Sequence, residues 1–134
     1  MKDYCCSTIP ESMAEHNDLG RLGEDKAAEY LQAKGYKIVE RNWYFHHKEV
    51  DIIAFDGDIV VFVEVRTRTS SDVLHPRDSV MPLKMRYLIL AADNYVRYKK
   101  LDNRIRFDLI ACISHRDGRW DIEHIEDAFT AQAE

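Results

Sequence analysis

The sequence lacks the long apolar segments of a membrane protein. Its unbroken apolar runs, such as Ile59 to Val63, fall far short of the roughly 20 residues that a spanning helix needs. No basic region followed by an apolar stretch opens the chain, so we expect no secretory signal peptide. Cysteine is scarce, and two of the three lie side by side at Cys5 and Cys6, which makes a poor disulfide framework. The expectation is a reduced, cytoplasmic protein with no membrane partner.

Motifs that identify several large protein classes are missing as well. The chain has no glycine-rich phosphate loop, no paired-cysteine zinc motif, no His-Glu-x-x-His segment and no Gly-x-Ser-x-Gly elbow. These absences exclude phosphate-loop nucleotide hydrolases, zinc fingers, common metalloproteases and α/β-hydrolases. An enzyme of another kind and a binding protein remain as candidates.

The composition is that of one ordinary globular domain. The chain has 134 residues, of which 46% are hydrophobic and 32% charged. A domain of this length buries roughly two-thirds of its unfolded surface and can fold without disulfides. Residues 1–16 show no sustained periodicity, so we predict a flexible N-terminal tail there, one domain over residues 17–129, and a short C-terminal tail over 130–134.

Charge is distributed unevenly along the chain. The net charge of −5 argues against a protein that coats nucleic acid indiscriminately. Between Glu64 and Arg106, however, ten basic residues stand against five acidic ones, a net charge of +5 that leaves −10 for the remainder. A bipolar protein can bind a polyanion on one side only. Two oppositely charged solvated faces are the alternative, and charge alone favours that alternative.

Periodicity predicts that the domain opens with a helix and a strand. Asn17 or Asp18 can cap a helix that runs to about Lys34, and Gly35 supplies the left-handed residue that ends it. The predicted apolar stripe of this helix consists of Leu19, Leu22, Ala27, Tyr30 and Leu31. An aromatic and β-branched strand follows over residues 36–45.

Two further strands, a second helix and two last strands are predicted after it. Residues 49–55 and 58–66 form strands that meet at an Asp56-Gly57 turn, the strongest short hairpin signal available. Pro82 begins a helix that ends near Lys100, with apolar spacing at Leu83, Tyr87, Leu90, Ala91, Tyr95 and Tyr98. Strands over 105–113 and from Trp120 onward complete one mixed α/β domain.

Two acidic residues interrupt the apolar strands of the hairpin. Asp51 and Glu64 each have aliphatic neighbours on both sides, where a carboxylate without a partner is costly to bury. With Asp56-Gly57 as the turn, Asp51 faces Phe62, and Glu64 is its diagonal neighbour on the same sheet face, with side chains roughly 5–8 Å apart. Arg66 lies two residues beyond Glu64 and points to the same face by strand alternation.

Glu24 is a plausible third acid at this place. Its helical neighbours Gly20, Ala27 and Ala28 are small and let the helix approach the sheet closely. Three acidic oxygen donors suit Mg²⁺ or Mn²⁺, which are hard ions that also bind phosphate. The alternative is a structural network in which Asp51 and Glu64 pair with arginines.

Four other residues leave alternatives open. Asp108 fits a cap, an ion-pair partner or a site residue, whereas Cys112, in an apolar strand, is most simply a small core residue. Of the adjacent pair His46 and His47, at most one can face the site, and exposed or packed histidines are the alternative.

The motifs resemble those of a known family of small bacterial proteins. Matching segments, in order, are Gly23-Glu24, Arg41-Asn42-Trp43, Glu49 to Ala54 and Phe62 to Arg68. This set is similar to the YraN-like family, and the resemblance covers about Asn17 to Phe129. The family looks like part of the PD-(D/E)XK nuclease superfamily, similar in layout to archaeal Holliday junction resolvases. The resemblance implies an α/β fold with a restriction-endonuclease-like αβββαβ core, a mixed sheet flanked by helices.

The resemblance also implies roles for individual residues. Asp51 and Glu64 would be ligands of Mg²⁺ or Mn²⁺, with the carbonyl oxygen of Val65 as a further ligand. Glu24 would be an auxiliary acid, and Arg66 stands at the position of the catalytic cation. Together with the charge distribution, this leads us to expect Arg66, Arg68, Lys84 and Arg86 along nucleic acid, with a solvated lysine as the alternative for Lys84.

The chain departs from the family pattern at two positions. Lys48 stands where a glycine usually precedes Glu49, and Arg66 stands where a lysine is expected. An arginine keeps the positive charge and grips phosphate through two nitrogens, but it does not give up its proton in proteins and cannot act as a general base. Cleavage then depends on a metal ion to activate water.

The sequence therefore leaves three functions open. The first is a divalent-metal-dependent endonuclease acting on DNA, with branched DNA as one candidate substrate. The second is a nucleic-acid-binding module of the same fold that lost cleavage when the lysine became arginine. The third is a scaffold that binds no nucleic acid. A resolvase of four-way junctions needs two active sites, so a homodimer also remains open.

Overall fold

The elements follow one another as the periodicity predicts. The computed structural model describes residues 11–70 and 82–129, with side chains described from residue 18 in the first helix and from 83 in the second. In chain order they are α1 (Glu11–Ala33), β1 (Lys37–Phe45), β2 (Lys48–Asp56), β3 (Ile59–Thr69), α2 (Pro82–Tyr98), β4 (Ile105–Ser114) and β5 (Trp120–Phe129). A helix, three strands, a helix and two strands are thus confirmed.

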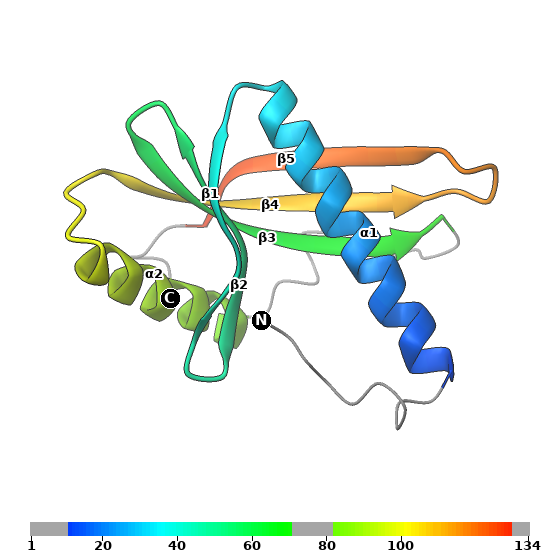
Figure 1. The fold of residues 1–134 in the computed structure, drawn as a ribbon, viewed down its shortest axis with the longest axis horizontal. Helices are drawn as coiled ribbons and strands as arrows, with labels where there is room; N and C mark the ends of the chain where they lie inside the picture. The colour runs from blue at the N-terminus through cyan, green and yellow to red at the C-terminus, as the bar shows by residue number, and fades with distance from the viewer. Residues whose placement is uncertain (1–10, 71–81, 130–134) are drawn as a thin grey trace.

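The five strands form one mixed sheet in the order β1-β2-β3-β4-β5. Only β3 and β4 are parallel among these pairs, and α2 lies in the crossover between them, as a parallel connection requires. In Figure 1, α1 crosses β3, β4 and β5 diagonally, while β1 and β2 run across the direction of the other strands. The α/β class with a mixed sheet flanked by helices is confirmed.

The two helices cover opposite faces of the sheet. Ala27, Ala28 and Leu31 of α1 pack against one set of strand residues, which includes Val61 and Val63. The α2 face forms a second cluster built from Leu88, Ala91, Ala92, Tyr95, Phe62 and Phe107. Cys112 is fully buried in the first cluster, so its expected place as a small core residue is confirmed. Within the described residues, no helix is both long and apolar enough to cross a membrane.

Helix α1 starts earlier than predicted and ends as predicted. It begins at Glu11 instead of Asn17 or Asp18, because the segment that follows Pro10 is rich in good helix formers such as glutamate, methionine and alanine. It ends at Ala33, and Gly35, whose φ of 96° is left-handed, closes the turn after it, with the Tyr36 N–H donating to the Leu31 carbonyl at 2.9 Å. Residues 1–10 and 130–134 of the predicted tails lie outside the described residues.

The β2–β3 hairpin has a different turn from the predicted one. Asp56 pairs with Ile59, so the turn residues are Gly57 and Asp58, and Gly57 has the φ of 61° that a type II′ turn requires at its first central position. The predicted pairing of Asp51 with Phe62 is wrong, because Phe62 pairs with Ile53. The register is shifted by two residues, which leaves every side chain on its predicted face.

The predicted apolar stripes of both helices are partly wrong. Leu22 is 51% exposed on α1, whose N-terminal half continues past β3 (Figure 1). On α2 the buried stripe is Leu88, Ala91, Ala92 and Tyr95, whereas Leu83, Tyr87, Leu90 and Tyr98 are exposed. Two apolar stripes run along α2 at helical spacing, and periodicity alone does not say which of them faces the sheet.

Asp108 is an ion-pair partner, and not part of the site built by the other acids. Arg106 donates to both of its oxygens at 2.9 Å, and the Asp127 N–H and His124 donate at 3.0 and 2.7 Å. Lys34 donates to the other ring nitrogen of His124 at 3.2 Å, so the Nε2 atom carries the histidine proton. Burial alone would raise the pKa of Asp108, but these hydrogen bonds hold that pKa below its usual value.

Gly23 lets α1 touch the sheet. A Cβ atom on Gly23 would overlap the Thr67 hydroxyl and lie 3.0 Å from the Thr67 Cβ, and the Gly23 carbonyl oxygen is 3.3 Å from the Cys112 sulfur. Gly20, one turn earlier, has open space around the same position. The glycine at 23 is therefore required for close packing, while the one at 20 is not.

We expect Gly23→Ala to destabilise the protein and Gly20→Ala to stabilise it. The first change forces α1 away from β3, and overpacking of this kind costs about 1–3 kcal/mol. The second improves helix propensity at a free position by up to about 1 kcal/mol. Urea unfolding followed by circular dichroism measures both changes, and equal effects of the two substitutions would contradict the close contact at Thr67.

Candidate metal and nucleic-acid site

The site lies where β1 and β2 bend away from β3. The β2–β3 pairing ends at Ile52 and Val63, and one step further the same register sets Asp51 opposite Glu64. On the other side, the β1–β2 register sets Asn42 opposite Asp51. Asn42 has a left-handed backbone, with a φ of 53°, which asparagine tolerates better than most residues. Because the strands bend here, β2 no longer pairs with β3 beside Asp51.

Asp51 and Glu64 are both buried at this place. Asp51 is 9% exposed, and its Oδ2 atom accepts a hydrogen bond from the Val65 N–H at 2.8 Å. Glu64 is 3% exposed, with Arg66 Nε 3.2 Å from Oε2 and Lys84 Nζ 3.6 Å from Oε1. The Glu64 Oε1 atom is fully buried and has no hydrogen-bond partner among the described residues.

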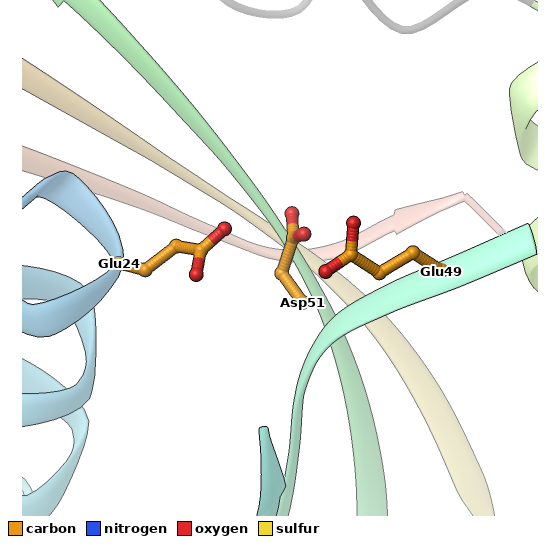
Figure 2. A group of neighbouring side chains, drawn as sticks. All are labelled: Glu24, Glu49 and Asp51. Carbon is orange, nitrogen blue, oxygen red and sulfur yellow. The ribbon is translucent and has the colours of Figure 1, made fainter. Parts of the chain in front are cut away.

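Glu24 and Glu49 complete a cluster of acids around Asp51. Each of these three residues offers a carboxylate oxygen that lies within 4.8 Å of the other two. In Figure 2, Glu24 reaches in from α1 and Glu49 comes from β2, so that Asp51 stands between them. The Asn42 amide nitrogen bridges the two glutamates, at 3.0 Å from Glu24 Oε1 and 2.6 Å from Glu49 Oε2. The predicted meeting of the Glu24 and Asp51 side chains is therefore present in the structure.

Glu49 and Asn42 also belong to this cluster, although neither was predicted as a site residue from the sequence. Glu49 is two residues before Asp51, and strand alternation places such a pair on one face, so a usable signal was present. Asn42 carried no such signal, because its position depends on the pairing of β1 with β2. His46 and His47 lie in the turn between these strands and are exposed, in accord with the simpler alternative for them.

Burial makes both central acids hard to ionise. The pKa of Asp51 is raised well above its usual value, first by burial and then by the charge of Glu64, and the Val65 N–H only partly offsets this. Burial also raises the pKa of Glu64, against the opposing charges of Lys84 and Arg66. Glu64 thus has the basic partners that the structural alternative predicted, whereas Asp51 has no ion pair among the described residues.

The basic residues divide into two groups. Arg66 and Arg68 line an open cavity of about 270 Å³ together with Glu24, and Lys84 contacts Glu64. Arg86 is exposed on the same helix as Lys84. The other group is occupied elsewhere: ion pairs join Arg97 to Asp93, Lys99 to Glu40, and Arg106 to Asp56 and Asp108. Among the described residues between Glu64 and Arg106, the positive charge is therefore not one continuous surface.

The family of the chain follows from a match to a family model. The family model described as "Uncharacterised protein family UPF0102" matches residues 23–112, a segment that contains the acids of the site from Glu24 to Glu64 and also Lys84. The chain belongs to this family. The resemblance to YraN-like proteins is thereby confirmed.

Relatives in this family align over most of their length. A UPF0102 protein of Flavobacterium psychrophilum is 52% identical over 117 residues, covering 87% of this chain and 98% of the relative. Those of Flavobacterium johnsoniae and Parabacteroides distasonis are 48% and 46% identical, covering 87% and 89% of this chain and 98% of each relative. The chain thus corresponds to nearly the whole of these proteins.

We expect Asp51→Asn to stabilise the protein when no divalent cation is present. A raised folded pKa means that ionised Asp51 is penalised in the folded state, fully above that pKa and not at all below about pH 3.8. The variant should therefore be more stable at pH 8 by about 1 kcal/mol, roughly 3–5 °C in Tm, with the difference vanishing as the pH falls toward 4.

Thermal unfolding in EDTA between pH 4 and pH 8 measures this effect. Asp93→Asn is the matched control, because that exposed acid pairs with Arg97 on the surface and should change the stability by less than about 0.5 kcal/mol. Mn²⁺ should raise the Tm of the wild type much more than that of Asp51→Asn. A variant that is less stable than wild type at pH 8 in EDTA would contradict the buried-charge interpretation.

Proposed function

We propose that this protein is a divalent-metal-dependent endonuclease that hydrolyses phosphodiester bonds in DNA. The observation that carries the proposal is the convergence of carboxylates and cations at one bend of the sheet. Asp51 and Glu64 lie directly beyond the last paired positions of β2 and β3, Ile52 and Val63, with Arg66 and Lys84 beside Glu64. Carboxylates bind divalent cations and basic side chains bind phosphate, so a site with both kinds of residue suits a phosphodiester substrate.

The donor set fits Mg²⁺ or Mn²⁺. All the candidate side-chain ligands are carboxylate oxygens, which hard cations prefer, and there is no cysteine or histidine among them. The Glu64 Oε1 atom is buried without a hydrogen bond, and the raised pKa of Asp51 means that its ionised form lacks compensation from the described residues. Asp51, Glu64 and the Val65 carbonyl would hold the cation, with Glu24 as an auxiliary acid. A bound cation supplies Lewis acidity, which activates water and stabilises charge on the phosphate.

The protein's own residues orient the substrate. Arg66 and Arg68 border the cavity next to Glu24, where a phosphate group could accept hydrogen bonds from either guanidinium. Lys84 approaches Glu64 from α2, and Arg86 extends the positive charge along that helix. These four residues would neutralise neighbouring phosphates of one strand and fix the position of the bond to be cleaved.

A binding module without cleavage is the second candidate, and Arg66 is the observation that favours it. Arginine supplies positive charge at this position but stays protonated, so it cannot act as a general base. In that case the carboxylates would still bind a cation, and the basic residues would still bind DNA. The two functions differ only in whether the phosphodiester bond is broken.

Cleavage in the presence of Mg²⁺ or Mn²⁺ tests the proposal. The wild type should nick one or more of three labelled substrates, namely duplex, single-stranded and four-way-junction DNA, and EDTA should abolish the nicking. The variant Asp51→Asn/Glu64→Gln should be inactive with every substrate. Binding without nicking would instead support the second candidate, and absence of both would support a scaffold that binds no nucleic acid.

The same assay measures the contribution of Arg66 to the cleavage rate. Its loss in Arg66→Ala should lower the cleavage rate about 10²–10³-fold, the usual effect of removing one preorganised donor from a transition state. Arg66→Lys should retain or raise the rate, because the positive charge remains. Nicking that appears only in Arg66→Lys would identify a degenerate wild-type site, and equal nicking by wild type and Arg66→Ala would exclude Arg66 from the chemistry.

We expect Lys84→Ala to weaken DNA binding through the loss of one phosphate contact. The slope of log affinity against log salt concentration should fall in magnitude by about 0.9 for duplex DNA. Lys99→Ala is the matched control, because Lys99 lies beyond the far end of α2, roughly 22 Å away at 1.5 Å per residue, and pairs with Glu40. Fluorescence anisotropy at several salt concentrations measures the slopes, and equal slopes for the two variants would place the DNA away from Lys84.

A further inference from the structure

Asn42 has two unusual features at the same position. Its backbone is left-handed in the middle of β1, where an extended conformation is the rule, and its register position is opposite Asp51. Its side-chain nitrogen is within hydrogen-bond distance of two carboxylates at once, at 3.0 Å from Glu24 and 2.6 Å from Glu49. These two acids come from different elements, α1 and β2, and Asn42 joins them.

The chemistry of the amide explains why it suits this place. Its NH₂ group has two N–H donors, so that one can serve each carboxylate. The carboxylate oxygens of Glu24, Glu49 and Asp51 lie within 4.8 Å of one another, where like charges repel. A neutral double donor holds two of the acids together without adding charge that would repel a cation.

We propose that Asn42 is a positioning residue, which holds Glu24 and Glu49 around Asp51 so that these acids help to bind the divalent cation. The proposal rests on the proposed function, because it assigns a role toward the cation of that site. The left-handed backbone of Asn42 sets the direction of its side-chain amide, and this amide holds the two glutamates in place. Asn42 itself does not touch the substrate.

Two substitutions separate the backbone role from the amide role. Asn42→Gly removes the amide but keeps the left-handed conformation, which glycine adopts freely. Asn42→Ala removes the amide and also strains the backbone. Both variants should lose the same factor in cation affinity, whereas Asn42→Ala should have the lower Tm. A purely structural role would instead make cation affinity follow the Tm.

Calorimetric titration with Mn²⁺ alone, without DNA, tests the proposal. Loss of a residue that orients metal ligands typically weakens metal binding 10–100-fold, and we expect Asn42→Gly to bind Mn²⁺ at least 10-fold more weakly than wild type. Lys100→Gly is the matched control, since Lys100 is another left-handed residue, with a φ of 57°, just after α2. That change should raise the Tm and leave Mn²⁺ affinity unchanged.

A double-mutant cycle shows whether Asn42 acts through Glu24. Glu24→Gln should weaken Mn²⁺ binding in the wild type and add little in the Asn42→Gly background, because the glutamate is no longer held. Fully additive losses would overturn the proposal, and so would an Asn42→Gly variant that binds Mn²⁺ within twofold of wild type. A wild type that binds no Mn²⁺ would overturn the metal-dependent function itself, and with it the role of Asn42.

Discussion

The burial of the Asp51 and Glu64 carboxylates is the constraint on which the rest of the site depends. Both are in a sheet whose neighbouring residues are aliphatic, where an ionised group without compensation is costly. Their compensation has to come from several elements at once. The backbone of β3 donates the Val65 N–H, the same strand supplies Arg66, and α2 supplies Lys84. The pKa values of both acids remain raised despite these partners, so ionising either carboxyl in the folded protein is unfavourable without further positive charge nearby.

A second buried aspartate shows what full compensation looks like. Asp108 is completely buried, yet its two oxygens accept four hydrogen bonds from Arg106, His124 and the Asp127 N–H. The pKa of Asp108 is accordingly lowered, whereas that of Asp51 is raised. Both aspartates are buried, but the ionised form of Asp108 is stabilised by its partners, whereas the ionised form of Asp51 is not. This contrast supports a structural role for Asp108 and a functional one for Asp51.

The close approach of α1 and the bend of β1 and β2 bring the site together. Gly23 lets the helix contact Thr67, and the next residue, Glu24, is thereby directed toward the sheet. The left-handed Asn42 lies where the pairing of β2 with β3 ends. The bend at this point brings the Asp51 carboxylate close to those of Glu24 and Glu49. A regular flat sheet packed against a more distant helix would hold the same residues without joining them. The close packing of α1 and the irregular backbone of β1 therefore both help to position the residues of the site.

The sequence by itself determined the element order, the sheet faces and the family, because these depend on local periodicity and on motifs within short segments. Asp51, Glu64 and Arg66 were placed on one face even though the predicted turn was displaced by one residue, since the register moved by an even number and alternation was kept. Tertiary structure alone decided which stripe of α2 is buried, that Lys84 reaches Glu64, and that Asn42 bridges Glu24 to Glu49. Such contacts join residues that are distant along the chain, and their geometry follows from helix approach and strand bending, which no local pattern encodes.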